Sequence, residues 1–216
     1  MFLGCLILVT TLEIVNVPVD ALEGWTESEY RRVPPNEVSV QDGALHIAIG
    51  RSSSPLVYKL ETPKRVKAFT VTATWNGELD IPADAVQGSE NSDDFVLKVG
   101  LVEAGDRTLN WFQRRVAADW ILELHELAPE GNGVRRINFY STTQQADQVG
   151  TSRHHPLSDL LYEERVLYLP EPGRFQLSRR FEEPIETLGL WISSDGDDTG
   201  SEFTLAIEQI ELEVVQ

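Results

Sequence analysis

Long stretches of the chain alternate between hydrophobic and polar side chains, which is the period of a β-strand with one buried face. The clearest case runs over residues 203–214, where the alternation shifts phase between Ile207 and Ile210. A phase shift of this kind predicts a β-bulge. Residues 66–75 repeat the pattern, with threonines opposite hydrophobic side chains.

Several shorter segments have the same composition. Asp42 and Gly43 separate two alternating runs, which predicts a β-hairpin because glycine readily adopts a positive φ. A helix is expected over residues 106–118, capped by Asp106 or Thr108. Residues 142–159 are expected to be irregular, with Ser158 capping a short turn. Strands are expected at 38–49 (as the hairpin), 56–60, 95–101, 120–124, 136–140, 166–169, 175–181 and 185–193.

About ten strands separated by turn residues predict an all-β fold. We expect a jelly-roll-like β-sandwich of about ten antiparallel strands, with one or two short helices and with the first and last strands as neighbours. Residues 22–216 have a suitable length for a single domain of this kind.

The first 21 residues have the composition of a signal peptide. Residues 1–12 are almost entirely apolar but too short to span a bilayer, and residues 19–21 fit a small-x-small cleavage site. Neither Lys nor Arg precedes Arg31, so the usual basic start is missing. One alternative is a lipoprotein signal ending at Cys5, if the true start lies upstream, and another is an N-terminal strand.

Charge restricts the classes of partner. The chain has 18 Lys and Arg against 35 Asp and Glu, giving a formal net charge of −17, so nucleic acids and anionic membranes are disfavoured partners. An acidic surface keeps a protein soluble and also suits divalent cations. The single cysteine excludes a disulfide framework and a thiolate zinc site.

The most suggestive polar run is the acidic turn, which we define as residues 194–202. Asp195, Asp197 and Asp198 place three carboxylates on a glycine-containing loop, and calcium prefers several such oxygens. These three residues are the predicted calcium ligands, with Asp93 and Asp94 as further candidates. The alternative is a solvated turn whose aspartates bond their own backbone.

The predicted ligand-binding surface lies in the region of the expected helix. Asn110, Trp111, Gln113 and Arg114 combine a flat aromatic ring with amide and guanidinium groups, as sugar-binding surfaces do.

Two other polar groups are weaker candidates. Glu78, Asp80 and Asp84 resemble a paired-carboxylate strand of a jelly-roll glycoside hydrolase, but Asp84 is out of step and Pro82 disrupts a central strand, which favours a surface loop. Adjacent histidines at 154 and 155 point opposite ways on an extended chain, so an exposed pair is expected.

Three motifs resemble those of a family of exported bacterial proteins with no assigned function. They are D-D-F at 93–95, R-T-L-N-W at 107–111, and G-L-W-I at 189–192 followed by D-G-D-D-T-G at 195–200. The family turn is similar to D-T-D-N-T-G, from which this chain departs at Gly196 and Asp198. The resemblance covers about residues 93–212 and implies a β-sandwich, but it implies no catalytic residue.

These observations favour a non-enzymatic, exported protein, periplasmic or extracellular, without a transmembrane segment. It is expected to bind a glycan or another component of the cell envelope, with structural calcium. One alternative is a polysaccharide-active enzyme with two acids about 5–10 Å apart in a cleft. Another is a structural domain that docks on a partner protein through an apolar patch.

Overall fold

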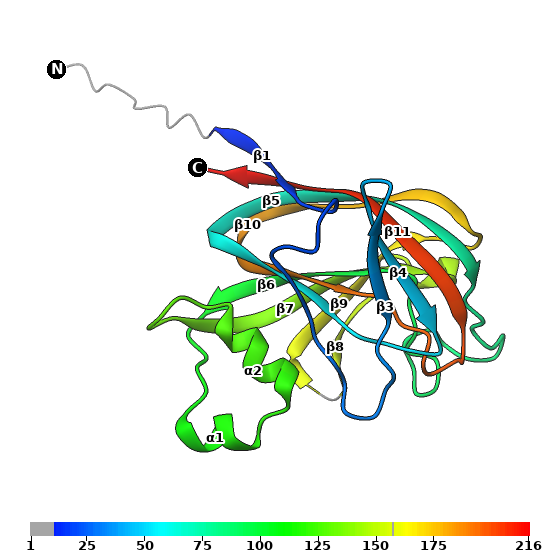
Figure 1. Cartoon of the computed structure of the whole chain (residues 1–216), viewed down its shortest axis with the longest axis horizontal. Coiled ribbons are helices and arrows are strands. Elements are labelled where there is room, and N and C mark those ends of the chain that lie inside the picture. The colour runs from blue at the N-terminus through cyan, green and yellow to red at the C-terminus, as the bar shows by residue number, and fades with distance from the viewer. Residues whose placement is uncertain (1–10, 157) are drawn as a thin grey trace.

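The computed structural model describes residues 11–156 and 158–216, which form a two-layer β-sandwich (Figure 1). Its helical elements are α1 (Trp111–Val116), α2 (Asp119–Glu126) and the 3-10 turn η1 (Ala146–Gln148). Its strands are β1 (Leu12–Val17), β2 (Trp25–Glu27), β3 (Glu37–Gln41), β4 (Ala44–Gly50), β5 (Leu56–Glu78), β6 (Lys98–Gly105), β7 (Gly133–Thr143), β8 (Ser152–His155), β9 (Ser158–Tyr168), β10 (Gly173–Ser193) and β11 (Glu202–Val215).

The described strands form one continuous sheet that folds over itself. The order is β3-β4-β11-β5-β10-β6-β7-β9-β8, with β1 beside β11 and β2 beside β5. The first layer holds β1, β3, β4 and β11 with residues 66–78 of β5 and 173–180 of β10. The second layer holds β2, β6, β7, β8 and β9 with the remaining halves of β5 and β10. The predicted all-β sandwich is therefore confirmed.

The two longest strands belong to both layers because they bend in the middle. The register of β10 against β5 shifts between Arg180 and Ile185, and again between Thr187 and Gly189. Pro184 lies in the first shift, and Pro63 of β5 lies opposite the second. Proline donates no ladder hydrogen bond, so strands bend at such points and can switch layers. The sequence pattern had divided each of these strands into two.

The main core lies between the layers, where period-2 alternation places hydrophobic side chains. Phe69, Val71, Ala73 and Trp75 of β5 are all at most 2% exposed, and Trp75 meets Phe203 of β11 edge-on at 6.4 Å between ring centroids. Burying each large hydrophobic side chain contributes roughly 1.5–3 kcal/mol.

A second hydrophobic cluster lies on the outer face of the second layer. Val102 of β6, Phe139 of β7 and Trp191 of β10 belong to it, and Leu124 and Leu127 from the α2 region pack against them. The helix covers only part of this face, and the remainder holds the cavity described below. None of the helices among residues 11–156 and 158–216 is long and apolar enough to cross a membrane.

The segment between β6 and β7 differs from the sequence prediction. The expected helix over 106–118 is shorter and forms α1, and the expected strand at 120–124 is instead α2. A helical period also fits the spacing of Trp120, Leu124 and Leu127. As a helix, this segment packs these side chains against the sheet, which favours a helix over the expected strand.

Four further expectations are corrected. Residues 142–159 are not irregular, because they hold η1, β8 and the start of β9. Ser158 begins β9 in place of the expected short turn. β7 and β9 pair in parallel, although all the strands were expected to be antiparallel. The strands on either side of the acidic turn do not form a hairpin, because β10 and β11 lie on opposite sides of β5. The acidic turn therefore crosses from one layer to the other.

The N-terminal segment joins the sheet. β1 pairs antiparallel with β11, from Leu12 opposite Val215 to Val17 opposite Ile210, so the first and last described strands are neighbours. These residues belong to the predicted signal peptide, and the alternative of an N-terminal strand matches the conformation that they adopt. Residues 1–10, with Cys5 and most of the apolar run, lie outside the described residues. The signal peptide stays a prediction.

Candidate functional site

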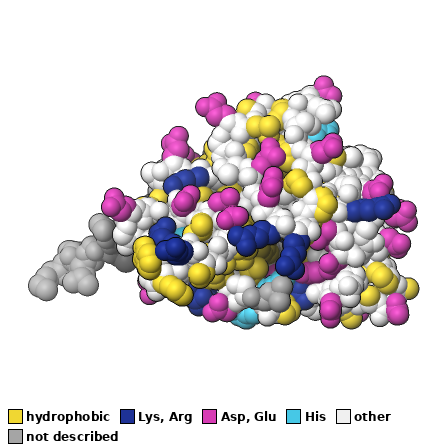
Figure 2. Space-filling view, turned by 60° about the horizontal axis from the view of Figure 1, so that its bottom comes forward, with side chains coloured by type: hydrophobic (Ala, Val, Ile, Leu, Met, Phe, Trp, Pro, Cys, Tyr) yellow, Lys and Arg dark blue, Asp and Glu magenta, His cyan; other side chains and the backbone are white. Residues whose placement is uncertain are grey.

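A cavity of about 320 Å³ opens on the outer face of the second layer, beside α2. Its walls are mostly hydrophobic, and charged and hydroxyl groups occupy the rest. On the face shown in Figure 2, hydrophobic side chains gather low on the molecule with Lys and Arg side chains close beside them. The lining residues are Tyr30, Lys98, Trp120, Ile137, Phe139, His155, Ser158, Leu161, Glu163, Trp191 and Ser193.

Strand alternation explains why these side chains share one face. Lys98 is two residues before Gly100 on β6, and Gly100 lies opposite Phe139 on β7. A Cβ at Gly100 would lie 2.8 Å from Phe139 Cε1 and 2.7 Å from Ile137 Cγ2. Only glycine at this position lets the two side chains lie across β6 as the floor of the cavity.

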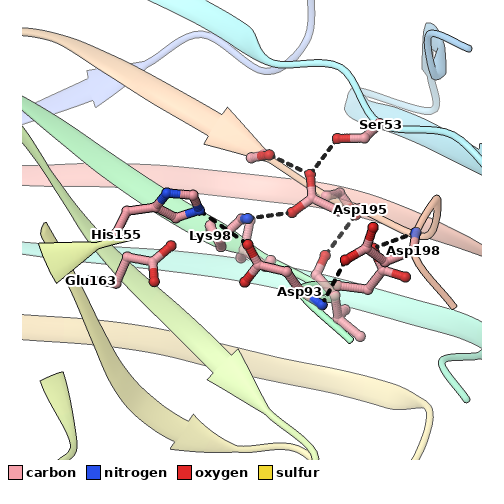
Figure 3. A network of polar contacts seen from close by, with 12 residues as sticks. Ser53, Asp93, Lys98, His155, Glu163, Asp195 and Asp198 are labelled. Atoms are coloured by element: carbon pink, nitrogen blue, oxygen red, sulfur yellow. Dashed lines mark hydrogen bonds and ion pairs between the residues drawn. The ribbon is translucent and has the colours of Figure 1, made fainter. Parts of the chain in front are cut away.

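Asp195 is the ion-pair partner of Lys98, which lines the cavity (Figure 3). Its Oδ2 lies 2.6 Å from Lys98 Nζ, and its Oδ1 accepts hydrogen bonds from Ser53 Oγ at 2.7 Å and Ser193 Oγ at 2.6 Å. The two charged side chains are 5% and 13% exposed, so this is a buried ion pair. Asp195 comes from the acidic turn and Lys98 from β6, and the pair therefore joins the turn to the cavity.

A second group of ion pairs lies beside the first. Arg153 of β8 contacts Asp93 Oδ1 at 2.9 Å through one terminal nitrogen and Glu163 Oε2 at 2.6 Å through Nε. His155 Nε2 lies 3.2 Å from Asp93 Oδ2. Arg165 is buried on β9, 3.7 Å from Glu163 Oε2. Two strands, β8 and β9, and the loop before β6 thus converge on one charge cluster.

These neighbours fix the ionisation of the central groups. Burial disfavours a charged Lys98, but the carboxylates of Asp195, Asp93 and Glu163 outweigh burial and raise the pKa of Lys98 above its usual value. Burial would raise the pKa of Asp93, but the hydrogen bond from His155 and the nearby cations hold that pKa below its usual range. Lys98 and Asp93 are therefore both charged at neutral pH.

The acidic turn is held by the motif that precedes β6. The Asp94 carboxylate accepts hydrogen bonds from the backbone N–H of Thr199 at 2.7 Å, the Thr199 hydroxyl at 2.7 Å and the backbone N–H of Asp198 at 3.3 Å. In return, the Asp198 carboxylate accepts from the backbone N–H of Asp93 at 3.1 Å. Two motifs about a hundred residues apart in the chain thus form one structural unit.

The three predicted calcium ligands have different surroundings. Asp195 is buried and paired with Lys98, and Asp198 is exposed and bonded to the Asp93 backbone. Asp197 is half-buried, and burial together with the charges of Asp195 and Asp94 raises its pKa to about 6. Calcium at these residues stays a prediction.

A different trio has potential metal-ligand atoms close together. In the described part of the chain, Asp93, His155 and Glu163 each place one such atom within 4.8 Å of the others. Arg153 already contacts both carboxylates, and Lys98 lies nearby, so the negative charge there is compensated without a metal ion.

None of the predicted ligand-binding residues at α1 is among the residues that line the cavity. Trp111 is 74% exposed, as a binding platform would be. Asn110 and Gln113 form a reciprocal capping box at the start of α1, and Arg114 Nε donates to the backbone oxygen of Leu109 at 3.2 Å. The amide oxygens of Asn110 and Gln113 are thus engaged in the helix cap, and this surface stays a prediction.

The two weaker candidates are also located. Glu78 ends β5, and Asp80 and Asp84 follow in the next loop, all three exposed, which matches the surface-loop interpretation. The histidines lie on β8 and point to opposite sides. His154 contacts the Tyr162 ring, whereas His155 reaches the cavity, so the expectation that both are exposed is wrong for His155.

Sequence reasoning missed most of the site. Lys98 and Trp120 fall in strands expected from the sequence, and Glu163 falls between the expected turn at Ser158 and the expected strand at 166–169. A usable signal did exist for Lys98 and Glu163, because charged residues inside hydrophobic strands are rarely buried unless they are paired.

No protein-family model matches the chain, and no curated protein sequence matches it. Among solved structures, it is similar to the N-terminal cellulose-binding domain of Cellulomonas fimi β-1,4-glucanase C, with 12% identity and a TM-score of 0.31, over 91% of this chain and 90% of that chain. It is also similar to the exoplasmic/lumenal domain of VIP36 in its Ca²⁺/Man3GlcNAc-bound form, with 10% identity and a TM-score of 0.38, over 90% and 86%. At these values the similarity concerns the β-sandwich fold alone.

Proposed function

We propose that this protein binds a carbohydrate in the cavity on the outer face of the second layer. The observation that carries the proposal is the composition of its wall: Trp120, Trp191 and Phe139 face the same 320 Å³ space as Lys98 and Glu163. A sugar ring has apolar C–H faces, which pack on aromatic rings, and a rim of hydroxyls, which bond to polar groups. A concave, mostly apolar site with a few placed polar groups is typical of small-molecule binding.

Binding is proposed rather than hydrolysis because the carboxylates of the cluster are already committed to cations. Glycoside hydrolysis by paired carboxylates needs one acid that stays protonated near neutral pH. Glu163 is bonded to Arg153, and the pKa of Asp93 is lowered, so neither has the surroundings of a general acid. Asp197 has a raised pKa, but it is not among the residues that line the cavity.

A glycan array followed by calorimetry tests the proposal, with two tryptophan variants compared. Trp120→Ala removes a half-buried ring that meets Trp191 edge-on at 6.2 Å, whereas Trp111→Ala removes an exposed ring on α1. Truncating an aromatic anchor costs about 2 kcal/mol, so Trp120→Ala should weaken binding at least about tenfold. Trp111→Ala should leave the affinity unchanged, and Trp120→Phe should recover part of it.

Two results would contradict this assignment. If Trp111→Ala abolishes binding and Trp120→Ala does not, the ligand lies on the surface formed by Asn110, Trp111, Gln113 and Arg114. If no glycan on the array binds, the carbohydrate proposal is wrong.

Export to the periplasm or the cell exterior, and a structural calcium at Asp195, Asp197 and Asp198, belong to the same proposal. A protein of the cell envelope meets polysaccharide and calcium together, and an acidic surface with a net charge of −17 suits divalent cations.

A further inference from the structure

The charge cluster of the cavity is internally balanced. Lys98 is paired with Asp195 at 2.6 Å, and Arg153 is paired with Glu163 at 2.6 Å and with Asp93 at 2.9 Å. Arg165 lies 3.7 Å from Glu163 Oε2 and supplies the third cation. Three carboxylates and three basic side chains therefore sum to zero when His155 is neutral and no cation is bound at Asp195.

Resting on the proposed function, we propose that the sugar bound in this cavity is uncharged, and that uronic or sulfated sugars are excluded. A ligand carboxylate would lose its hydration without gaining an unpaired protein cation, and such burial is costly. Glu163, which lines the cavity, would repel it at close range. The net charge of −17 would also oppose its approach at low ionic strength.

Hydroxyl groups suit the same site better than charges. A hydroxyl both donates and accepts, so it can bond to an ammonium, a carboxylate or another hydroxyl without changing the charge balance. The cavity offers all three kinds, in Lys98, Glu163 and the hydroxyls of Tyr30, Ser158 and Ser193. The Lys98–Asp195 and Arg153–Glu163 pairs can thus remain intact while Lys98 and Glu163, which line the cavity, contact the ligand.

The size of the cavity limits what fits. Its volume of about 320 Å³ lies at the lower end of the range for ligand pockets, which is roughly 300–1,000 Å³. The proposal is therefore that one or two uncharged rings of a longer chain enter the cavity.

The test compares oligosaccharides that differ only in charge. Calorimetry on the full chain would use cello- and manno-oligosaccharides and the same oligosaccharides oxidised at C6 to uronates. The neutral form should bind about tenfold more tightly or better, because the oxidised form buries an unpaired charge. The affinity of the neutral form should stay constant between about 0.05 and 0.5 M NaCl, since no ion pair forms between the protein and this ligand.

A variant tests the same idea by changing the protein. Asp195→Asn keeps the acceptor for Ser53 and Ser193 but leaves Lys98 without its closest counter-ion. This variant should shift the preference toward the oxidised ligand by about tenfold, whereas Glu202→Gln, which alters an exposed pair with Arg51, should not.

The outcomes separate the two proposals. If the oxidised form binds wild type as tightly as the neutral form or more tightly, and its affinity falls with salt, the inference is overturned while carbohydrate binding stands. If neither the neutral nor the oxidised form of the cello- and manno-oligosaccharides binds, and no glycan on the array binds, the carbohydrate-binding proposal is wrong. This inference is then wrong with it.

Discussion

The buried pair of Lys98 and Asp195 should be the most sensitive electrostatic contact of the fold. Lys98→Met keeps most of the volume of the side chain and removes its charge. The partner carboxylate is 5% exposed and would then be left without a counter-ion. Breaking a buried pair from one side costs about 3–5 kcal/mol in free energy of unfolding.

The hydrogen bonds of Asp195 narrow the expected loss in free energy of unfolding. Asp195 keeps two short hydroxyl donors, Ser53 and Ser193, which continue to solvate its charge in the variant. We therefore expect the lower end, about 3 kcal/mol. The double variant Lys98→Met with Asp195→Asn removes both charges and leaves an acceptor for the two hydroxyls. Its free energy of unfolding should therefore lie within about 1 kcal/mol of the wild-type value.

Urea unfolding followed by tryptophan fluorescence measures these differences. With a slope of roughly 2–3 kcal/mol per molar urea, Lys98→Met should lower the midpoint by about 1 M. Arg51→Met is the matched control, because the Arg51–Glu202 pair is 70% and 63% exposed and should contribute about 0–1 kcal/mol. The reasoning is refuted if Lys98→Met costs no more than Arg51→Met, or if the double variant is as unstable as the single one.

Three other predictions follow from the same geometry. Gly100→Ala places a Cβ 2.8 Å from Phe139 Cε1, so it should lower the free energy of unfolding by about 1–3 kcal/mol and weaken glycan binding. An unchanged unfolding free energy together with an unchanged glycan affinity would contradict the packing described for the floor of the cavity. The pKa of Asp197 is about 6 in the folded state against 3.8 as its reference, so its contribution to stability is present below the reference value and is lost as pH rises through about 6. Asp197→Asn should therefore raise the melting temperature more at about pH 8 than at about pH 4, and an equal effect at both would refute this. If the acidic turn holds calcium, millimolar calcium should raise the melting temperature of EDTA-treated wild type but not of Asp195→Ala or Asp197→Ala. A ligand at about 100 times its Kd stabilises a protein by about 2.7 kcal/mol, which a thermal melt resolves. Melting curves that coincide with and without calcium would remove the calcium prediction.

Local patterns predicted the strands well because alternation is a property of neighbouring residues. The hairpin between β3 and β4 turns at Asp42 and Gly43, with φ values of 50° and 78°, as the dipeptide indicated. The phase shift after Ile207 is a register shift against β5, as expected for a bulge.

The errors in the fold came from choices that tertiary contacts decide. Residues 120–124 have strand composition, but their hydrophobic side chains also fit a helix, and the exposed outer face of the sheet selects the helix. The parallel pairing of β7 with β9 depends on the path of the chain between them, which alternation does not encode.

The site was harder to predict because its residues meet across long sequence separations. Arg153 contacts Asp93, 60 residues away, and Lys98 contacts Asp195, 97 residues away. Each is one charged residue with no local repeat around it. The acidic turn and the D-D-F motif were found because each is a compact run, and their mutual hydrogen bonds appear only in three dimensions.

The acidic turn was a calcium candidate because three neighbouring aspartates repel one another. In the structure, each has a separate means of relieving that repulsion. Asp195 is paired with Lys98, and Asp198 accepts a hydrogen bond from the backbone N–H of Asp93. The raised pKa of Asp197 allows its carboxylate to be neutralised by protonation as the pH falls through about 6. Since the first of these also positions Lys98 at the cavity, the turn has a role in building the proposed binding site whether or not a cation occupies it.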